Sequence, residues 1–207
     1  GAVIRGAPLA RVAAFLAPRY PGATIATDSI TAHHLTAFLR SLGMRHHRFK
    51  RGYRNVIREA QSLTAEGTLT PLAIETSGHG ALSENYFLDD GAYMAVKMVI
   101  AAARAKQDST TLESLIADLG APAERAERRV PIAGADFAAY ADTVLAAFEE
   151  RAKAQGIMPE ESHEGVRLGL NGGWMLLRKS LHEPLLPLNT ESDSPGGAKA
   201  ALALAKE

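Results

Sequence analysis

Residues 71–80 read Pro71-Leu72-Ala73-Ile74-Glu75-Thr76-Ser77-Gly78-His79-Gly80. The apolar start of this run predicts a short buried strand, and the polar, glycine-containing remainder predicts a loop at its carboxyl end. The upstream sequence predicts two further strands with helices between the three: strands at 24–27 and 46–49, helices at 31–41 and 53–65. Alternation of strand and helix predicts a parallel sheet with crossover helices, hence an α/β three-layer domain.

Helices are also predicted on either side of this strand–helix alternation. They cover residues 7–17, 91–105 and 110–119. Asp28-Ser29 is expected to cap helix 31–41, and Asp89 or Asp90 to cap helix 91–105. The apolar residues of helix 91–105 recur at helical spacing and predict its core-facing side: Ala92, Ala95, Val96, Val99, Ile100 and Ala103.

A different pattern begins near residue 120, where we place a domain boundary. Residues 121–207 predict a small α+β domain on an antiparallel sheet, with a long helix at 135–154 and a final helix after Gly196-Gly197. Asn171-Gly172 predicts a hairpin between two of the strands. The predicted strands are 128–132, 165–170, 173–178 and 185–190.

Composition excludes several classes of protein. The chain of 207 residues has no cysteine, so disulfides, thiolate nucleophiles and Cys-ligated zinc are excluded, and a cytoplasmic location is favoured. Lys plus Arg and Asp plus Glu are both 23, which argues against general polyanion binding. The most apolar stretch, residues 92–103, contains Lys97 and is too short to span a bilayer. We therefore expect neither a nucleic-acid nor a membrane partner.

The loop after the strand at 71–74 is the first candidate site. Glu75 can accept two hydroxyl hydrogen bonds, Ser77 can donate or accept, and His79 can reach a further oxygen. Ligands of open α/β sheets bind at the carboxyl ends of strands, and these groups suit a polyhydroxylated ring. The alternative is a connecting loop whose polar groups only satisfy the backbone.

The second candidate site is the loop between the strands at 173–178 and 185–190. Arg178 offers a bidentate fork to a phosphate. Ser180, His182 and neighbouring backbone N–H groups could complete an anion cradle. The alternative is a solvated basic hairpin loop.

A basic run and two histidine pairs are further candidates. Residues 45–58 contain six Arg or Lys and no acidic residue before Glu59. Nucleic-acid binding, a solvated face, or a contact of one or two of these side chains with a phosphate would each account for the run. His33-His34 and His46-His47 are interpreted as structural or surface histidines, and no metal ligand is predicted.

Three motifs resemble the α-D-phosphohexomutase family. Residues 74–79, followed by residues 85–91, closely resemble the sugar-recognition loop of phosphoglucomutases and phosphomannomutases, with E-x-S-G-H retained. Arg178-x-Ser180, followed by Glu183-Pro184, resembles the family's phosphate-binding loop, with His182 where threonine is common. Residues 52–56 resemble the family's G-F-K-N-I segment, with Arg54 in place of lysine.

This resemblance implies the C-terminal half of a hexose-phosphate mutase. Residues 1–120 would be the third domain, and 121–207 the fourth, a fold similar to the TATA-box-binding protein. Glu75, Ser77 and His79 would bind the sugar of a glucose or mannose 1- or 6-phosphate. Arg178, Ser180, His182 and Arg54 would bind phosphate.

The resemblance also implies what other domains must supply. The family's phosphoserine loop and its D-x-D-x-D-R magnesium loop do not occur here, so no catalytic residue and no Mg²⁺ ligand is assigned. The missing N-terminal domains of the same enzyme would be partners, and this chain alone would be inactive. The alternative is a stand-alone sugar-phosphate-binding module or a subunit of a split enzyme.

Overall fold

The computed structural model describes residues 6–133, 136–180 and 183–205. The chain divides into two compact units, Gly1–Gly120 and Ala121–Glu207, each with its own sheet. They are called unit 1 and unit 2 below. Among the described helices, none has the length and apolar character needed to cross a membrane.

Unit 1 is built on a four-stranded mixed sheet with the order β2-β1-β3-β4. The three predicted strands pair in parallel, as expected. A fourth strand, which the sequence analysis missed, pairs antiparallel with β3 and makes residues 72–82 a hairpin. The strands are β1 (Thr24–Asp28), β2 (Arg45–Phe49), β3 (Leu72–Ile74) and β4 (Gly80–Leu82).

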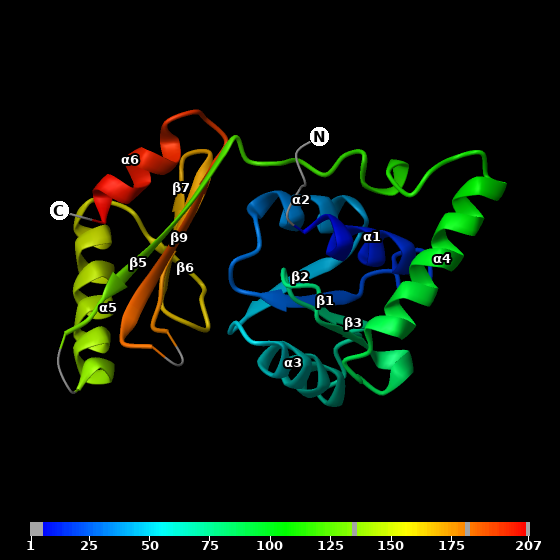
Figure 1. Ribbon diagram of the computed structural model, residues 1–207, viewed down its shortest axis with the longest axis horizontal. Helices are drawn as coiled ribbons and strands as arrows, with labels where there is room; N and C mark the ends of the chain where they lie inside the picture. Colours follow the sequence, from blue (N-terminus) through cyan, green and yellow to red (C-terminus); the bar gives the residue numbers. More distant parts are fainter. Residues whose placement is uncertain (1–5, 134–135, 181–182, 206–207) are drawn as a thin grey trace. The chain divides into compact units, whose positions relative to one another are not determined.

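The strand order explains why helices cover both faces of this sheet. The chain moves from β1 outward to β2 and then back across β1 to β3, so right-handed crossovers place α2 (His33–Ser41) and α3 (Tyr53–Ala65) on opposite faces. Figure 1 shows α3 on one side of the sheet and α1 (Ala7–Leu16) and α2 on the other. The predicted α/β three-layer domain is thus confirmed.

Side chains along each strand alternate between the two cores. Ile25 packs with α1 and α2, whereas Ala26 and Ala73 pack with Val56 and Ala60 of α3. The small alanines allow α3 to lie close to the sheet, and the larger side chains fill the other core.

Helix α4 (Gly91–Gln107) begins as predicted, because Asp90 accepts a 2.9 Å hydrogen bond from the Tyr93 N–H. The predicted side was wrong: the residues buried against unit 1 are Met94, Ala101 and Ala105. The six residues assigned to the core are exposed instead. Periodicity could not choose between the faces, because α4 is apolar on both of them.

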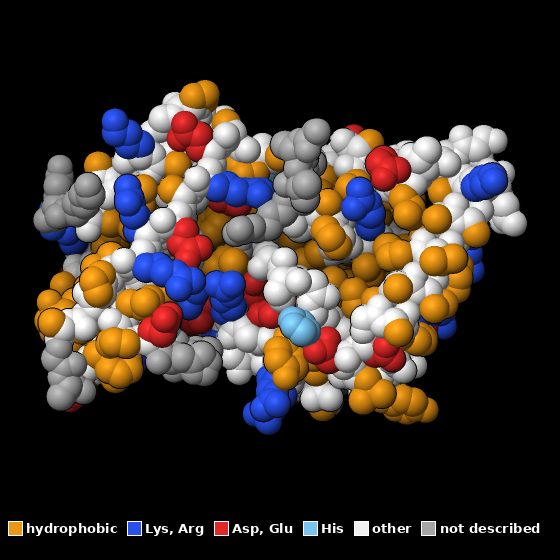
Figure 2. Space-filling view, viewed as in Figure 1, with side chains coloured by type: hydrophobic (Ala, Val, Ile, Leu, Met, Phe, Trp, Pro, Cys, Tyr) orange, Lys and Arg blue, Asp and Glu red, His pale blue; other side chains and the backbone are white. Residues whose placement is uncertain are grey.

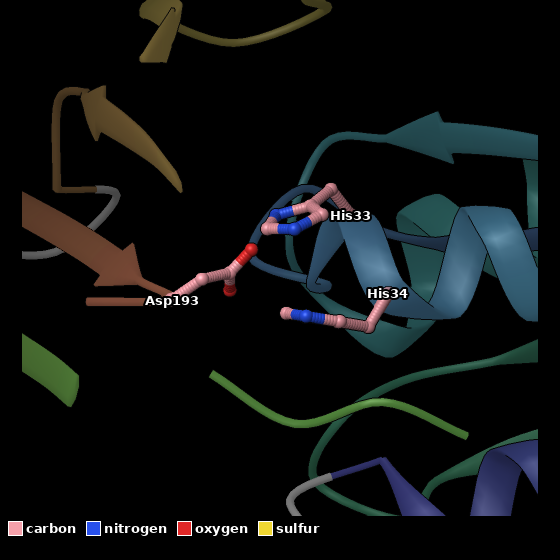
Figure 3. A group of neighbouring side chains, drawn as sticks. All are labelled: His33, His34 and Asp193. Atoms are coloured by element: carbon pink, nitrogen blue, oxygen red, sulfur yellow. The ribbon is translucent and has the colours of Figure 1, made fainter. Parts of the chain in front are cut away.

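Two other local expectations in unit 1 were wrong. Residues 110–119 contain only a short 3-10 turn, η2 (Ser114–Ile116). Asp28 does not cap α2, whose N-cap is Ala32 without a side-chain hydrogen bond. The start of α2 instead carries two neighbouring imidazoles, shown in Figure 3: the rings of His33 and His34 are tilted by 32° and have centroids 4.0 Å apart.

Unit 2 is a five-stranded antiparallel sheet with the order β5-β9-β8-β7-β6. One face packs against two helices, which Figure 1 shows on that side of the sheet, and the predicted α+β fold is confirmed. Its elements are β5 (Glu124–Pro131), α5 (Phe137–Ala154), β6 (Pro159–Glu160), β7 (Val166–Leu170), β8 (Gly173–Leu177), β9 (Leu185–Ser192) and α6 (Gly197–Leu204).

The turn at Asn171-Gly172 joins β7 and β8, as predicted. Gly172 has the positive φ of 68° that such a turn requires. Its carbonyl accepts a 2.7 Å hydrogen bond from the N–H of Asp193, the residue after β9 that Figure 3 also labels. This bond ties the hairpin turn to the end of the neighbouring strand.

The opposite face of this sheet carries a buried polar network around the only tryptophan. The indole N–H of Trp174 donates a 2.9 Å hydrogen bond to Glu191, whose other oxygen lies 2.8 Å from the Arg125 Nε. The Arg167 guanidinium lies 4.0 Å from the Trp174 ring centroid and pairs with Glu160 at 2.8 Å. Arg167 and Glu191 are buried, and each is paired with an oppositely charged side chain that is in part exposed to solvent, as buried charges require.

Candidate functional site

The candidate sugar loop, residues 75–79, is the tight turn of the β3–β4 hairpin. The N–H of Glu75 donates to the His79 carbonyl at 2.9 Å, and the N–H of Gly78 donates to the Glu75 carbonyl at 3.0 Å. Gly78 has φ 97°, which favours glycine at this position. The turn exposes Ser77 and His79 and leaves Glu75 only 7% exposed.

The Glu75 carboxylate connects the loop to the start of α3. One oxygen accepts a 2.6 Å hydrogen bond from the Gly52 N–H, and the other accepts a 3.0 Å bond from the Ser77 hydroxyl. Gly52 has φ 112°, and a Cβ there would lie 3.0 Å from the Asn55 amide nitrogen. The backbone conformation of Gly52 therefore directs its N–H toward Glu75, and this hydrogen bond fixes the carboxylate.

Asp28, at the end of β1, holds the loop from beneath. Its carboxylate accepts hydrogen bonds from the Thr76 hydroxyl at 2.7 Å and the Thr76 N–H at 3.3 Å. Burial raises the pKa of Asp28 to about 6 from an ordinary 3.8, although the bonds from Thr76 favour the charged form. Asp28 is 1% exposed, so it can position the loop but cannot contact a ligand directly.

His79 is oriented by two neighbours from different elements. Its Nδ1 lies 3.0 Å from Asp89, whose other oxygen accepts a 3.2 Å hydrogen bond from the Gly80 N–H. The Tyr53 ring stacks on the imidazole with centroids 4.9 Å apart. A carboxylate accepts but does not donate, so the neutral ring carries its proton on Nδ1 and presents Nε2 as an acceptor.

The arginines of the basic run at residues 45–58 have different roles. Arg48 donates to the Thr31 hydroxyl, the Ala32 carbonyl and the Thr36 hydroxyl, and so supports the start of α2. Arg54 is exposed in the first turn of α3 and donates to the Tyr53 hydroxyl at 3.1 Å. Arg54 is thus linked to the candidate sugar loop through Tyr53, whose ring stacks on His79.

The candidate phosphate loop of unit 2 joins β8 to β9. The N–H of Arg178 donates to the Pro187 carbonyl at 3.1 Å, and the N–H of Ser180 donates to the Leu185 carbonyl at 3.0 Å. The Ser180 hydroxyl accepts a 3.2 Å bond from the Glu183 N–H. His182, also predicted to bind phosphate, lies outside the described residues.

The Arg178 side chain is buried in this structure, with the residue 6% exposed. Its Nε lies 3.9 Å from a Glu164 oxygen, and Nη1 donates a long, 3.4 Å hydrogen bond to the Lys179 carbonyl. Gly165 allows the two strands to approach closely here, since a Cβ on it would lie 2.7 Å from the Arg178 Cα. This close backbone contact thus fixes the position of the Arg178 Cα, from which the side chain extends.

The polar groups of the sugar loop suit hydroxyl recognition better than magnesium binding. Mg²⁺ needs several oxygen ligands directed at one point. Asp28 and Glu75 instead direct their oxygens at donors of Thr76, Gly52 and Ser77. Asp90 caps α4. These carboxylates do not fit a magnesium ion, whereas the exposed hydroxyl and imidazole beside a fixed carboxylate provide donors and acceptors for a sugar.

Sequence reasoning missed three contributors to this arrangement. Asp28 was expected to cap a helix, and Tyr53 was given no role in the site. Asp89 was considered as a cap, and it proves to orient His79. A signal did exist: Asp28 is the last residue of a parallel strand, Gly52 and Glu75 each follow shortly after one, and the carboxyl ends of such strands meet at one edge.

Comparison with known proteins gives the family. The model of the phosphoglucomutase/phosphomannomutase alpha/beta/alpha domain III matches residues 9–121, more than half of the chain. A phosphomannomutase/phosphoglucomutase of Pseudomonas putida is 28% identical over 177 residues, which are 85% of this chain and 35% of that protein. The chain thus spans about a third of the length of this curated relative.

Solved structures show the same fold over nearly the whole chain. A phosphoglucomutase/phosphomannomutase family protein from Burkholderia thailandensis has a TM-score of 0.75 and 23% identity, covering 99% of this chain and 42% of that one. N-acetylphosphoglucosamine mutase from Aspergillus fumigatus, solved with GlcNAc-6P and magnesium, has a TM-score of 0.55 and 14% identity, covering 98% of this chain and 46% of that one. The family model, the curated relative and the solved structures agree: the chain belongs to the phosphoglucomutase/phosphomannomutase family and corresponds to a C-terminal region of it.

Proposed function

We propose that this chain is the substrate-binding C-terminal part of a hexose-phosphate mutase. Unit 1 binds the sugar hydroxyls through Glu75, Ser77 and His79, and unit 2 binds the phosphate distal to the reacting one through Arg178 and Ser180. Arg54 and His182 are assigned to phosphate contacts as well. The hexose is a 1- or 6-phosphate of glucose or mannose.

One observation carries the proposal: the polar groups of the sugar loop are held in place before any ligand binds. Glu75 is fixed by Gly52 and Ser77, and His79 by Asp89. A carboxylate, a hydroxyl and an imidazole on one five-residue turn match the alternating donors and acceptors of a sugar ring. Preorganisation lowers the entropy cost of binding, because the loop need not order itself around the ligand.

Phosphoryl transfer requires groups that we do not assign to this chain. An in-line nucleophile and cations that neutralise the developing charge are both needed. The carboxylates around the sugar loop do not fit Mg²⁺, so we assign the magnesium ligands and the phosphoserine to the remaining domains. We therefore expect this chain alone to bind hexose phosphate without mutase turnover.

Titration of the 207-residue chain with glucose 6-phosphate and with inorganic phosphate, followed by NMR, tests the assignments. Arg178→Ala should weaken both ligands at least tenfold, since a charge-assisted contact contributes roughly 1.5–3 kcal/mol. Glu75→Gln should weaken glucose 6-phosphate and leave inorganic phosphate unchanged. Arg128→Ala, which removes an exposed arginine from β5, serves as the charge-matched control.

The results that contradict the proposal are specific to each unit. An unchanged dissociation constant for Arg178→Ala removes this arginine from the phosphate site. Equal losses of both ligands in Glu75→Gln show that Glu75 supports folding or phosphate binding rather than sugar recognition. Measurable turnover of glucose 1-phosphate by the chain alone would disprove the division of labour between domains.

A further inference from the structure

Helix α4 presents an apolar stripe on the face that unit 1 leaves uncovered. Val96, Val99 and Ile100 are 57%, 69% and 37% exposed, and three alanines complete the stripe: Ala92, Ala95 and Ala103. Figure 2 shows hydrophobic side chains gathered along this helix. Single exposed apolar residues are common on protein surfaces, but six on one face of one helix form a contiguous patch.

The opposite face of α4 already packs against unit 1. The stripe is therefore not the side of the helix that forms the core of this unit. Met94, Ala101 and Ala105 are buried against the rest of unit 1. A helix that is apolar on both sides is characteristic of a helix packed between two layers. Along the stripe, Lys106 is the first charged residue. Burial of the six residues of the stripe would therefore remove no charged side chain from water.

A groove continues from the stripe to the candidate sugar loop. It has a volume of about 440 Å³ and is lined by α1 and α4, including Val12, Met94 and Met98, and by Gly78 of the turn. An element that packs on the stripe would therefore also reach the edge of the loop proposed to bind sugar.

We propose that this surface, the α4 stripe with its adjoining groove, is the docking face for the part of the phosphohexomutase that this chain does not contain. The inference rests on the proposed function. The chain covers 35% of its curated relative and 42% of a solved relative, so most of such an enzyme lies outside it. Three alanines and three β-branched side chains on this face form the hollows and ridges into which another element packs.

A second copy of this chain fits the surface less well. A stable complex of separate chains buries roughly 800 Å² on each partner and uses about 20–30 residues a side. A six-residue stripe is well below that number. Domains joined in one polypeptide need less contact area, because the linkage raises their effective concentration.

Cysteine labelling tests the proposal directly, because the chain has no cysteine of its own. Val99→Cys introduces a thiol on the stripe, and Gln61→Cys introduces one on the exposed side of α3 as the matched control. Both should react rapidly with a maleimide in the isolated chain. The probe is a polypeptide containing the part of the Pseudomonas putida enzyme that precedes its match to this chain.

Adding the probe should slow labelling of Val99→Cys at least tenfold and leave Gln61→Cys unchanged. Equal rates with and without the probe overturn the proposal. So does a dimer of the isolated chain, seen by sedimentation, that Val99→Asp dissociates, since the occupant is then a second copy. Labelling reports contact rather than sugar binding, so protection without glucose 6-phosphate binding would sink the proposed function and leave this docking face standing.

Discussion

The Thr76 hydroxyl donates a 2.7 Å hydrogen bond to the buried carboxylate of Asp28, although 48 positions separate the two residues. The bond joins the end of β1 to the middle of the turn that follows β3. It places an ionisable group directly under the candidate sugar loop, at a position that no ligand reaches.

Stability should therefore depend on the protonation of Asp28. Its pKa in the folded chain is raised to about 6 from 3.8, so the folded state holds this proton more tightly than the unfolded state does. The resulting stabilisation is complete below about pH 4 and is lost as pH rises through about 6, a difference of about 3 kcal/mol. Urea unfolding of the wild type and Asp28→Asn between pH 4 and 7 measures it.

The free energy of unfolding of the wild type should fall relative to that of Asp28→Asn across this window. The comparison of two variants cancels the titration of groups they share. A constant difference from pH 4 to 7 would mean that Asp28 has an ordinary pKa and that its bonds with Thr76 outweigh burial. A change confined to one unit is expected, because Asp28 and Thr76 both belong to unit 1.

Removing the Asp89 carboxylate should change the proton position on His79. Asp89 accepts at Nδ1 in the structure, so the neutral imidazole carries its proton there. Asp89→Ala should shift the tautomer balance toward the Nε2–H form, as measured from the ¹⁵N shifts of the ring above pH 8. Asp90→Asn is the control, since Asp90 caps α4 and does not contact the ring; the same tautomer in wild type and Asp89→Ala would refute the assignment.

Unit 2 should lose stability when Glu191 is removed. Glu191→Ala leaves the buried Trp174 indole N–H and Arg125 without their acceptor, at a cost of about 2–4 kcal/mol. Glu191→Gln keeps one carbonyl acceptor and should lose less. Fluorescence of Trp174, the only tryptophan, reports unfolding of this unit. Glu150→Gln on the exposed side of α5 is the control, and equal midpoints for all three variants would argue against the network.

A methyl group at Gly165 should be more damaging than its small size suggests. Gly165 has φ 59°, and a Cβ would overlap the Leu177 carbonyl oxygen and lie 2.7 Å from the Arg178 Cα. Both neighbours are backbone atoms that cannot move aside alone, so we expect Gly165→Ala to cost at least about 2 kcal/mol. Thermal unfolding measures this loss, and Gly156→Ala, with φ 77° and open space around its Cβ, separates clash from backbone strain.

Sequence reasoning predicted the elements better than the contacts between them. Helix 53–65 and the parallel strands followed from local patterns, because the periodicity of apolar residues is itself local. Strand β4 was missed because it has only three residues, Gly80, Ala81 and Leu82, and none of them is β-branched or aromatic. Its formation depends on pairing with β3, a tertiary event.

The candidate loops followed from their motifs, but their supports did not. Glu75 and Arg178 can be picked out by residue type and by resemblance to a family. The partners of Glu75 and Thr76 lie 23 and 48 positions away, and no pattern within the loop encodes such pairs. The exposed face of α4 was misassigned for a related reason: the periodicity marks an apolar face without saying what covers it.

The turn at 75–79 is held by Asp28, Gly52 and Asp89, none of which lies within the turn itself. Its shape can therefore change during evolution while residues 75–79 themselves stay the same. Two relatives with identical turns could prefer different hexoses because a strand end or a helix start beneath the turn has changed. Attempts to re-engineer the preferred sugar should vary these supporting positions before the residues that we propose to bind it.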